Sequence, residues 1–463
     1  MAAEKEQVYL AFDLGASSGR AILGRVGGDG QIRIEEVHRF PNGPVTTADG
    51  VFWDIDALFE AMLEGMAKVA AAGVAPRAVG VDTWGVDFAL LDEAGELLEP
   101  PRSYREPRNA GISRRVAERI GPERLLERTG SMHQDHASLC QLLAVKEHTP
   151  ELLGRARGLL FIPDLLNYWL CGARSTDCTF ASTSQMYDVV RREWAADILS
   201  ELSLPSEILP PVQTGPGVVG ALGREIRRRT ALGEVPVVAG AGHDTGAAFG
   251  LVQRADLPPE DDLVVISSGT WSILGIFVDE HLPAGTLDPR RFGYEANPDG
   301  SLRIIRNLPG GWLIERCREA WSAAGVDCSY DALISAARAA AGGSGASAII
   351  DTEWEGFMNP ASMPEAIQRH CRQTHQPAPQ TPGEFAQVIF ASLAESYARS
   401  INELRQKTHR PLGSLYMIGG MSRNEYLNEL TEQRAGVRVI VGPAEATAMG
   451  NVAVQMAAIE KAT

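Results

Sequence analysis

Residues 8–26 read VYLAFDLGASSGRAILGRV, in which two apolar runs flank a bend of small residues at 13–19. Residues 263–278 read LVVISSGTWSILGIFV and repeat this arrangement around a bend at 268–270. Apolar, β-favouring runs on both sides of a small-residue bend predict a strand, a tight turn and a second strand. A turn that exposes backbone N–H groups and Ser or Thr hydroxyls suits phosphate oxygens. Two such turns, one in each half of the chain, predict a nucleotide held from two sides.

The size and composition of the chain are typical of a globular protein with more than one domain. Its 463 residues suffice for two or more domains, and 44% of them are hydrophobic and 22% charged. The net charge of -16 argues against binding to nucleic acid, which depends on clustered Lys and Arg. No apolar run approaches the length of a membrane span, and the start, MAAEKEQVYLAF, lacks the features of a signal peptide. We therefore expect a cytoplasmic protein that binds neither nucleic acid nor membrane.

The six cysteines are dispersed along the chain and include no C-x-x-C pair. Neither a zinc ribbon nor a thioredoxin-like motif is therefore predicted. We expect reduced, mostly buried thiols.

Strand and helix patterns alternate along both halves of the chain. Asp54 is placed to cap a helix that stops near Gly73, and residues 79–92 read as strand, turn and strand. Further on, VPVVAGAGHDTGAAFG predicts a buried strand that opens into a helix, and the apolar periodicity of 383–408 predicts a long helix.

Hairpins mixed with crossover helices predict an α/β fold with a mixed sheet in each half. A polar, Pro-containing stretch at 253–262 separates the halves. We place the domain boundary at its start, with an N-terminal lobe of residues 1–252 and a C-terminal lobe of residues 253–463. Ligands of such folds bind outside the carboxyl ends of the strands. The predicted site is therefore a cleft between two related lobes.

Asp13 ends the first apolar strand and begins the bend. A turn-forming Asp is common at such a place, but a carboxylate there also suits Mg²⁺, which takes one or two carboxylates together with phosphate oxygens. The small residues that follow favour the metal role. The segment also matches G-x-S-x-G around Ser17, which is typical of a hydrolase nucleophile only where a helix follows the serine. Because residues 20–26 are strand-like, a hydrolase is the weaker alternative.

Asp244 lies in the segment GHDTG at 242–246, where the second buried strand opens into a helix. It is either a plain helix cap or a carboxylate that accepts the proton of a sugar hydroxyl while that oxygen attacks phosphorus. The flanking glycines let a ligand approach the backbone closely, which favours the second role. The chain contains no G-x-x-x-x-G-K-[ST] motif, so a kinase here needs another architecture.

Two further segments carry candidate sites. Residues 132–136 read MHQDH but lack a third spaced ligand, so a polar loop or pocket edge is favoured over a metal site. Gly419 and Gly420 follow an apolar strand and precede a helix, where a glycine admits a base or a ribose against the backbone.

Together these segments resemble the FGGY carbohydrate kinases. The matching motifs follow the family order over nearly the whole chain and are DLGASSGR (13–20), VDTWGVDFALLD (81–92), IPDLLNYWL (162–170), GHDT (242–245), SSGTWS (267–272), RNLPGGWLIE (306–315), IGGMSRNEYLN (418–428) and VGPAEATAMGN (441–451). The resemblance implies two lobes of the actin-like, ribonuclease-H-like ATPase fold that bind ATP, Mg²⁺ and a ketose. It also implies transfer of the terminal phosphoryl group of ATP to the 1-hydroxyl of the ketose. We expect the protein to be a monomer or a homodimer.

The resemblance implies roles for individual residues. Asp244 is the implied proton acceptor, and Asp13 lies near the metal. The implied sugar-binding residues are Gly85, His243, Asp244, Thr245 and Asn307. The implied ATP-binding residues are Ala16, Ser17, Ser18, Gly19, Arg20, Thr270 and Gly420.

The chain departs from the family pattern at several positions. Glu315 stands where the family has Gln. The replacements in the predicted sugar-binding lobe are Glu106, Ala137, Cys140 and Phe180. Hydroxyl discrimination depends on such side chains, so the sugar stays open: L-rhamnulose is the first substrate to test, with L-fuculose and L-xylulose as alternatives. A sugar-responsive protein without catalysis is an alternative of another class, against which the retained Asp13 and Asp244 argue.

Overall fold

Each half of the chain builds a mixed β-sheet around one of the two predicted hairpins. The computed structural model describes residues 6–326, 328–343, 347–358 and 360–462. It divides into two compact units, and neither unit is continuous in sequence. Unit 1 comprises Met1–Asp256, Val278–Ile304 and Ala446–Thr463, and unit 2 comprises Leu257–Phe277 and Ile305–Glu445.

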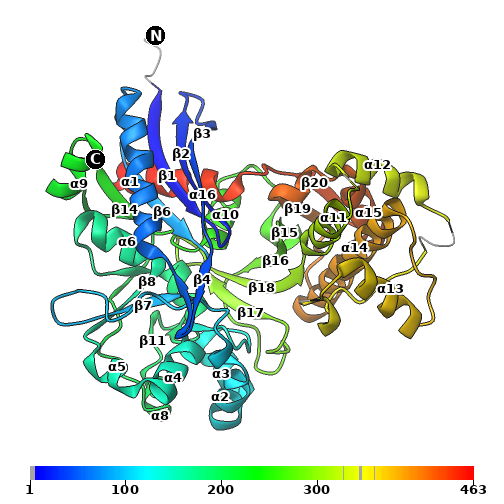
Figure 1. Cartoon of the computed structure of the whole chain (residues 1–463), viewed down its shortest axis with the longest axis horizontal. Coiled ribbons are helices and arrows are strands. Elements are labelled where there is room, and N and C mark those ends of the chain that lie inside the picture. The colour runs from blue at the N-terminus through cyan, green and yellow to red at the C-terminus, as the bar shows by residue number, and fades with distance from the viewer. Residues whose placement is uncertain (1–5, 327, 344–346, 359, 463) are drawn as a thin grey trace. The chain divides into compact units, whose positions relative to one another are not determined.

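The sheet of unit 1 carries the first hairpin at its centre. Its strand order is β13-β14-β6-β1-β2-β3 (Figure 1). The strands are β1 (Gln7–Leu14), β2 (Ser18–Val26), β3 (Ile32–Pro41), β6 (Val79–Thr83), β13 (Gly217–Ala221) and β14 (Pro236–Ala239). β1 pairs antiparallel with β2 and parallel with β6, which pairs parallel with β14. The carboxyl ends of β1, β6 and β14 therefore meet at one edge of this sheet.

The second sheet repeats the pattern around the second hairpin. Its strand order is β17-β18-β16-β15-β19-β20. The strands are β15 (Leu263–Ser268), β16 (Trp271–Val278), β17 (Gly293–Ala296), β18 (Leu302–Pro309), β19 (Ser414–Ile418) and β20 (Arg438–Val441). β15 pairs antiparallel with β16 and parallel with β19, which pairs parallel with β20. The order β16-β15-β19-β20 in the second sheet, with its antiparallel and parallel pairings, therefore matches the order β2-β1-β6-β14 in the first. The prediction of two related α/β halves with mixed sheets is confirmed.

Helices and short strand pairs complete unit 1. Its helices are α1 (Ile55–Ala71), α2 (Ile112–Ile120), α3 (Pro122–Thr129), α4 (Ser138–His148), α5 (Pro150–Arg155), α6 (Ile162–Cys171), α7 (Cys178–Ala181), α8 (Ala196–Glu201), α9 (Arg224–Thr230), α10 (Asp244–Val252) and α16 (Ala446–Ala462). The short strands pair as β4 (Pro44–Thr47) with β5 (Gly50–Trp53), β7 (Phe88–Leu91) with β8 (Gly158–Phe161), β9 (Thr176–Asp177) with β12 (Val212–Gln213), and β10 (Tyr187–Asp188) with β11 (Glu193–Trp194).

The first predicted helix forms as α1. Asp54 accepts a hydrogen bond from the backbone N–H of Ala57 (3.1 Å), and Gly73 follows the helix with a φ of 72°. The apolar stripe of α1, which includes Leu58 and Met62, is buried in the core beside the sheet.

The helices of unit 2 are α11 (Trp312–Ala323), α12 (Tyr330–Ala340), α13 (Met363–Gln373), α14 (Pro382–Thr408) and α15 (Glu425–Ala435). The long predicted helix is confirmed as α14, which begins with a capping box between Thr381 and Glu384. α14 packs against both α12 and α15 (Figure 1). In the part of the chain that the structure covers, no helix combines the length and the apolar character that crossing a membrane requires. The cysteines carry free thiols, as predicted.

The last helix returns to unit 1, which the sequence patterns did not indicate. Val452 of α16 contacts the β2 backbone at Gly24, and the amide of Gln455 donates to the carbonyl oxygen of Leu10 in β1 (3.0 Å). Residues 446–462 thus pack with the N-terminal sheet, whereas the predicted division grouped them with the C-terminal lobe.

Gly450 is the point where α16 approaches α10 most tightly. A Cβ at this position would lie 1.8 Å from the carbonyl oxygen of Ala247. We expect Gly450→Ala to lower the free energy of unfolding by about 1–3 kcal/mol, because the two helices must separate. Urea unfolding measures this loss.

Gly154→Ala is the matched control. Gly154 is exposed in α5, and a Cβ there would meet nothing within 4 Å. Alanine favours helix over glycine by up to about 1 kcal/mol, so this variant should be as stable as the wild type or slightly more so. Equal unfolding midpoints for the two variants would show that the α10–α16 contact tolerates a methyl group.

Candidate active site

The turn between β1 and β2 is a preshaped backbone loop. The N–H of Gly15 donates to the carbonyl oxygen of Ser18 (2.9 Å). Asn42 holds the loop from outside: its amide donates to the oxygen of Gly15 (2.7 Å), and its N–H donates to the oxygen of Ser17 (3.2 Å). A Cβ on Gly19 would lie 2.1 Å from the ring of Phe40, so only glycine fits there without displacing that ring. The predicted ATP-binding residues 16–20 all belong to this loop and the start of β2.

The hydrolase alternative is wrong. Strand β2 begins at Ser18, so the residue after Ser17 enters a strand instead of the helix that a nucleophile elbow requires. Within the described ranges, no group of three or more His, Cys, Asp or Glu residues is placed to hold a metal ion, at residues 132–136 or elsewhere.

Charged side chains gather where β1 ends. Asp13 lies opposite Arg20 in the antiparallel pair and forms an ion pair with it. Asp13 also lies in register with Asp82 in the parallel pair with β6. Residues in register on neighbouring strands project to the same face of a sheet, so Asp13, Arg20 and Asp82 share one face at this edge.

Asp82 is a site residue that the sequence reasoning missed. Its side chain is fully buried, and Oδ2 accepts a hydrogen bond from the amide of Asn451 in α16 (2.6 Å). Oδ1 is buried as well and accepts no hydrogen bond from any described residue. Burial, and then the negative charge of Asp13, raises the pKa of Asp82 well above its usual range, while the Asn451 bond opposes that rise. Its position inside the motif VDTWGVD was the only sequence signal.

The segment after β14 reaches the same edge. The N–H of Thr83 donates to the oxygen of Gly242 (2.8 Å), which continues the parallel pairing one step beyond the strands. Asp177 accepts the N–H of Gly242 (2.8 Å), and the hydroxyl of Thr179 accepts the N–H of His243 (3.3 Å). This backbone is therefore held from both sides.

These contacts place the predicted base and its neighbours. Asp244 is the first residue of α10, and its Oδ1 accepts the N–H of Thr245 (2.5 Å). The imidazole Nε2 of His243 lies 3.3 Å from that same oxygen, and its Nδ1 lies 3.7 Å from a carboxylate oxygen of Glu295. A Cβ on Gly85 would lie 3.1 Å from the His243 ring, so the backbone of Gly85 packs closely against the imidazole.

The predicted site residues of unit 1 thus come together at the carboxyl ends of three parallel strands. Asp13 lies near the end of β1, residues 16–20 form the bend after β1 and the start of β2, Gly85 follows β6, and residues 243–245 follow β14. The charge of Asp244 also acts on Asp82. A carboxylate base and a phosphate-type loop on one sheet edge are the components of phosphoryl transfer.

Unit 2 holds a second built turn. The carbonyl oxygen of Thr270 accepts the N–H groups of Gly310 (3.2 Å) and Trp312 (3.1 Å), which ties the turn after β15 to the start of α11. A Cβ on Gly419 would lie 2.6 Å from the oxygen of Ser268, so the backbone after β19 touches this turn directly. Thr270 and the glycine pair at 419–420 therefore belong to one edge of the second sheet.

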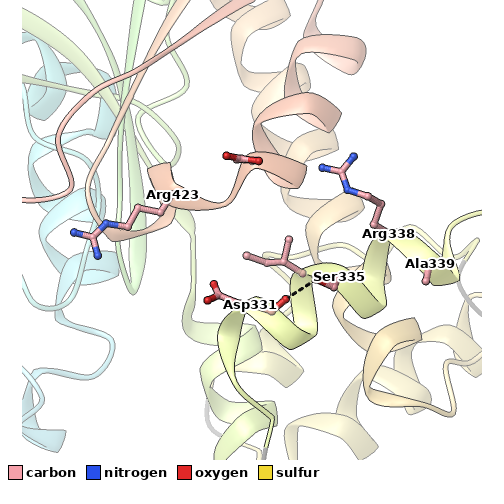
Figure 2. A pocket seen from close by; sticks show the side chains of 7 residues that line it. Asp331, Ser335, Arg338, Ala339 and Arg423 are labelled. Carbon is pink, nitrogen blue, oxygen red and sulfur yellow. Dashed lines mark hydrogen bonds between the residues drawn. The ribbon is translucent and has the colours of Figure 1, made fainter.

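A cavity of ≈ 590 Å³ opens between α12 and two residues that follow β19, Arg423 and Glu425. It is lined by Asp331, Ile334, Ser335, Arg338, Ala339, Arg423 and Glu425. Figure 2 shows that these labelled side chains come from α12 and from the turn at Gly420–Arg423. A Cβ on Gly420 would meet nothing within 4 Å, which leaves its backbone open to a ligand.

Two further residues lie in unit 2: Asn307, a predicted sugar contact, and Glu315, which stands where the family has Gln. Asn307 is in β18, and its Oδ1 is buried without a hydrogen bond from the described residues. Glu315, in the first turn of α11, pairs with Arg318 (2.9 Å). The role of Asn307 in sugar binding stays a prediction, as do the roles of the other site residues, and no role was predicted for Glu315.

Solved structures define the class of fold. A ligand-bound xylulose kinase from Lactobacillus acidophilus superposes with a TM-score of 0.79 at 15% identity, covering 98% of this chain and 90% of that one. Plasmodium falciparum glycerol kinase with ADP gives a TM-score of 0.76 at 13% identity, covering 97% and 89%. The chain therefore has the two-domain α/β fold of these sugar kinases.

Sequence comparison defines the family. Residues 8–250 match the N-terminal domain, and residues 264–459 the C-terminal domain, of the FGGY family of carbohydrate kinases. Rhamnulokinase from Bacteroides thetaiotaomicron is 36% identical over 458 residues, which cover 99% of this chain and 92% of the relative. Rhamnulokinase from Oceanobacillus iheyensis is 35% identical, with coverage of 98% and 94%. The chain belongs to the FGGY family of carbohydrate kinases, and it is a phosphotransferase that acts on a sugar hydroxyl.

Gly419 allows the backbone after β19 to lie against the turn after β15. Its φ is 84°, and a side chain would collide with the backbone of Ser268. We expect Gly419→Ala to weaken ADP binding at least tenfold, because the two turns must separate. Isothermal titration with ADP measures the change.

Gly436→Ala provides the control for a glycine with positive φ. Gly436 has a φ of 60° and a ψ of 45° at the end of α15, and its surroundings are open, so Gly436→Ala carries the strain of a left-handed residue, about 1–2 kcal/mol, and leaves the turn unchanged. Gly419 has a φ of 84° and a ψ of 178°, a region essentially restricted to glycine, so Gly419→Ala is strained there and also alters the turn. The same ADP affinity in both variants would contradict the assignment of this turn to the nucleotide.

Proposed function

We propose that the protein transfers the γ-phosphoryl group of Mg²⁺-bound ATP to the 1-hydroxyl of L-rhamnulose. The single observation that carries this proposal is the gathering of Asp244, Asp13 and the β1–β2 loop at one edge of the first sheet. The substrate is proposed from the relatives named rhamnulokinase, which match nearly the full length of the chain.

Asp244 is the proposed general base. Its carboxylate accepts the proton of the sugar hydroxyl as the hydroxyl oxygen bonds to the γ-phosphorus and the bond between that phosphorus and the leaving ADP breaks. The N–H of Thr245 and the His243 ring lie against the same carboxylate oxygen and orient it. Gly85, His243, Thr245 and Asn307 are the proposed sugar contacts, and Gly85 lies against the His243 ring, which lies beside the base.

The phosphates of ATP are proposed to bind the loop at 16–20 and the turn at Thr270. The nucleoside is proposed to bind the cavity lined by Arg423 and Glu425, which follow Gly420 in the chain. Backbone N–H groups, the hydroxyls of Ser17 and Ser18, and the guanidinium of Arg20 are ordinary phosphate ligands. Asp13 is the proposed carboxylate for Mg²⁺, which neutralises charge that develops on the phosphate oxygens. Carboxylate oxygens are the ligands that this hard cation prefers, so the acidic edge of β1 fits it.

Three further features stay predictions: the cleft between the lobes, the state as monomer or homodimer, and the cytoplasmic location. Another ketose is the main alternative to L-rhamnulose, because the replacements at Glu106, Ala137, Cys140 and Phe180 all lie in the predicted sugar-binding lobe.

Asp244→Asn tests the base. We expect kcat to fall by about 10²–10⁴-fold, the usual contribution of a general base, while the affinity for sugar changes little. Steady-state kinetics gives kcat, and calorimetric titration with L-rhamnulose gives the affinity.

Asp54→Asn is the control for the loss of one carboxylate. Asp54 caps α1, and Asn caps a helix as well as Asp does, so turnover should stay at the wild-type rate. A near-normal kcat in Asp244→Asn would remove Asp244 from the mechanism.

A panel of sugars tests the substrate. ADP release measured with L-rhamnulose, L-fuculose and L-xylulose, each with and without Mg²⁺, should give the highest kcat/KM for L-rhamnulose and a rate near background without the metal. A higher kcat/KM for another ketose would reassign the sugar. Absence of a phosphorylated product with every sugar would favour the non-catalytic alternative.

A further inference from the structure

A second buried carboxylate near the site has no part in the proposed chemistry. Asp87 is fully buried, and its Oδ2 accepts hydrogen bonds from the indole N–H groups of Trp53 (2.6 Å) and Trp84 (2.9 Å). The same oxygen accepts the backbone N–H of Tyr104 (3.2 Å). Oδ1 accepts the side-chain amide of Gln141 (2.9 Å). One carboxylate therefore joins β5, the turn after β6, the loop before α2, and α4.

These four donors are neutral N–H groups, and each of them needs an acceptor at this position. An unpaired buried N–H costs about 1–3 kcal/mol, so the two oxygens of Asp87 hold all four segments in place. The rings held in this way lie against each other: the centroids of Trp53 and Trp84 are 4.1 Å apart, and Tyr104 packs edge-on to His136.

The residue before Asp87 has an uncommon backbone conformation. Val86 has a φ of 70°, and a β-branched residue is an outlier in this region. Such a conformation persists only when its surroundings fix it. Here the carbonyl oxygen of Val86 accepts the hydroxyl of Ser138 (2.5 Å) and the amide of Gln141 (3.3 Å).

The fixed backbone leads directly to the proposed sugar contact. Gly85 precedes Val86 and lies against the His243 ring, which lies against the proposed base. The charge of Asp244 acts on Tyr104, which places that side chain toward the same region. The hydrogen bonds of Asp87 go to Trp53, Trp84, Tyr104 and Gln141, so its influence on Asp244 passes through the Gly85–Val86 turn and the aromatic side chains.

We propose that Asp87 is a positioning residue for the sugar: with Gln141, it holds the strained Gly85–Val86 turn and the Trp84 and Tyr104 segments in the geometry that receives the ketose. This inference rests on the proposed function. It assigns sugar affinity to a buried network that does not touch the reacting atoms, and it assigns no part in nucleotide binding to that network.

Asp87→Asn tests the proposal. The amide places N–H groups where an acceptor stood, so at least one of the four donors loses its partner. We expect the KM for L-rhamnulose and its calorimetric Kd in the absence of ATP to rise at least tenfold. The KM for ATP should stay within twofold of the wild-type value.

Two further variants separate positioning from a general loss of stability. Gln141→Leu keeps the volume of the side chain but removes the bonds to Asp87 and Val86, and it should raise the same two sugar constants by at least threefold. If Asp87→Asn does not fold, the sugar constants of Gln141→Leu decide whether the positioning role holds. Asp188→Asn is the matched control, because Asp188 is a buried carboxylate that accepts the N–H groups of Val190 and Arg191 and pairs with Arg128. It should lower the melting temperature without changing either sugar constant.

The outcomes distinguish the two levels of the proposal. If the wild type phosphorylates L-rhamnulose and both Asp87→Asn and Gln141→Leu keep its sugar KM and Kd, the positioning role is overturned and the proposed function stands. If the wild type neither binds nor phosphorylates L-rhamnulose, the proposed substrate fails, and the same variants are measured with the best ketose of the panel. A rise in the sugar constants of Asp188→Asn equal to that of Asp87→Asn would also overturn the positioning role.

Discussion

The in-register parallel pairing of β1 with β6 is the constraint on which the rest of unit 1 depends. It places Asp13 beside Asp82 and lets the segment after β14 continue along β6, so that three strand ends and their polar residues share one edge. Two neighbouring carboxylates are unfavourable in a buried setting unless other groups stabilise them. Arg20 does so for Asp13, and Asn451 does so for Asp82. The charges at this edge are thus partly balanced by the protein, which leaves an acidic edge that suits a metal-bound phosphate.

In both units, a glycine allows two backbone segments to pack directly against each other. In unit 1, α10 and α16 touch at Gly450, which allows α16 to carry Asn451 to the buried end of β6. In unit 2, Gly419 brings the segment after β19 against the turn after β15. In each case a side chain would move a backbone that supports a candidate site, so the glycines serve geometry more than flexibility.

The proposed roles in unit 1 fall to two sets of residues. Asp244 and the β1–β2 loop carry the proposed chemistry, whereas the Gly85–Val86 turn is held by the buried network of Asp87 and Gln141. Preorganisation of this kind lowers the cost of binding, since the protein groups are already ordered before the ligand arrives.

Local sequence patterns were enough to predict the local features. Periodicity, caps and small residues predicted the two hairpins, α1 with its Asp54 cap, the long α14 and the strand that opens into α10, because these signals act between neighbours in the chain. The motif matches singled out Asp13, the loop at 16–20 and Asp244, whose roles remain predictions.

The long-range contacts could be seen only in the folded protein. The bond between Asn451 and Asp82 joins residues 369 positions apart, and the donors of Asp87 come from four separate segments. The placement of α16 with the first sheet has the same origin. No local pattern records such contacts, because a buried polar group is satisfied by whichever donors the folded chain brings to it, and those donors are fixed only when the sheets and helices have packed.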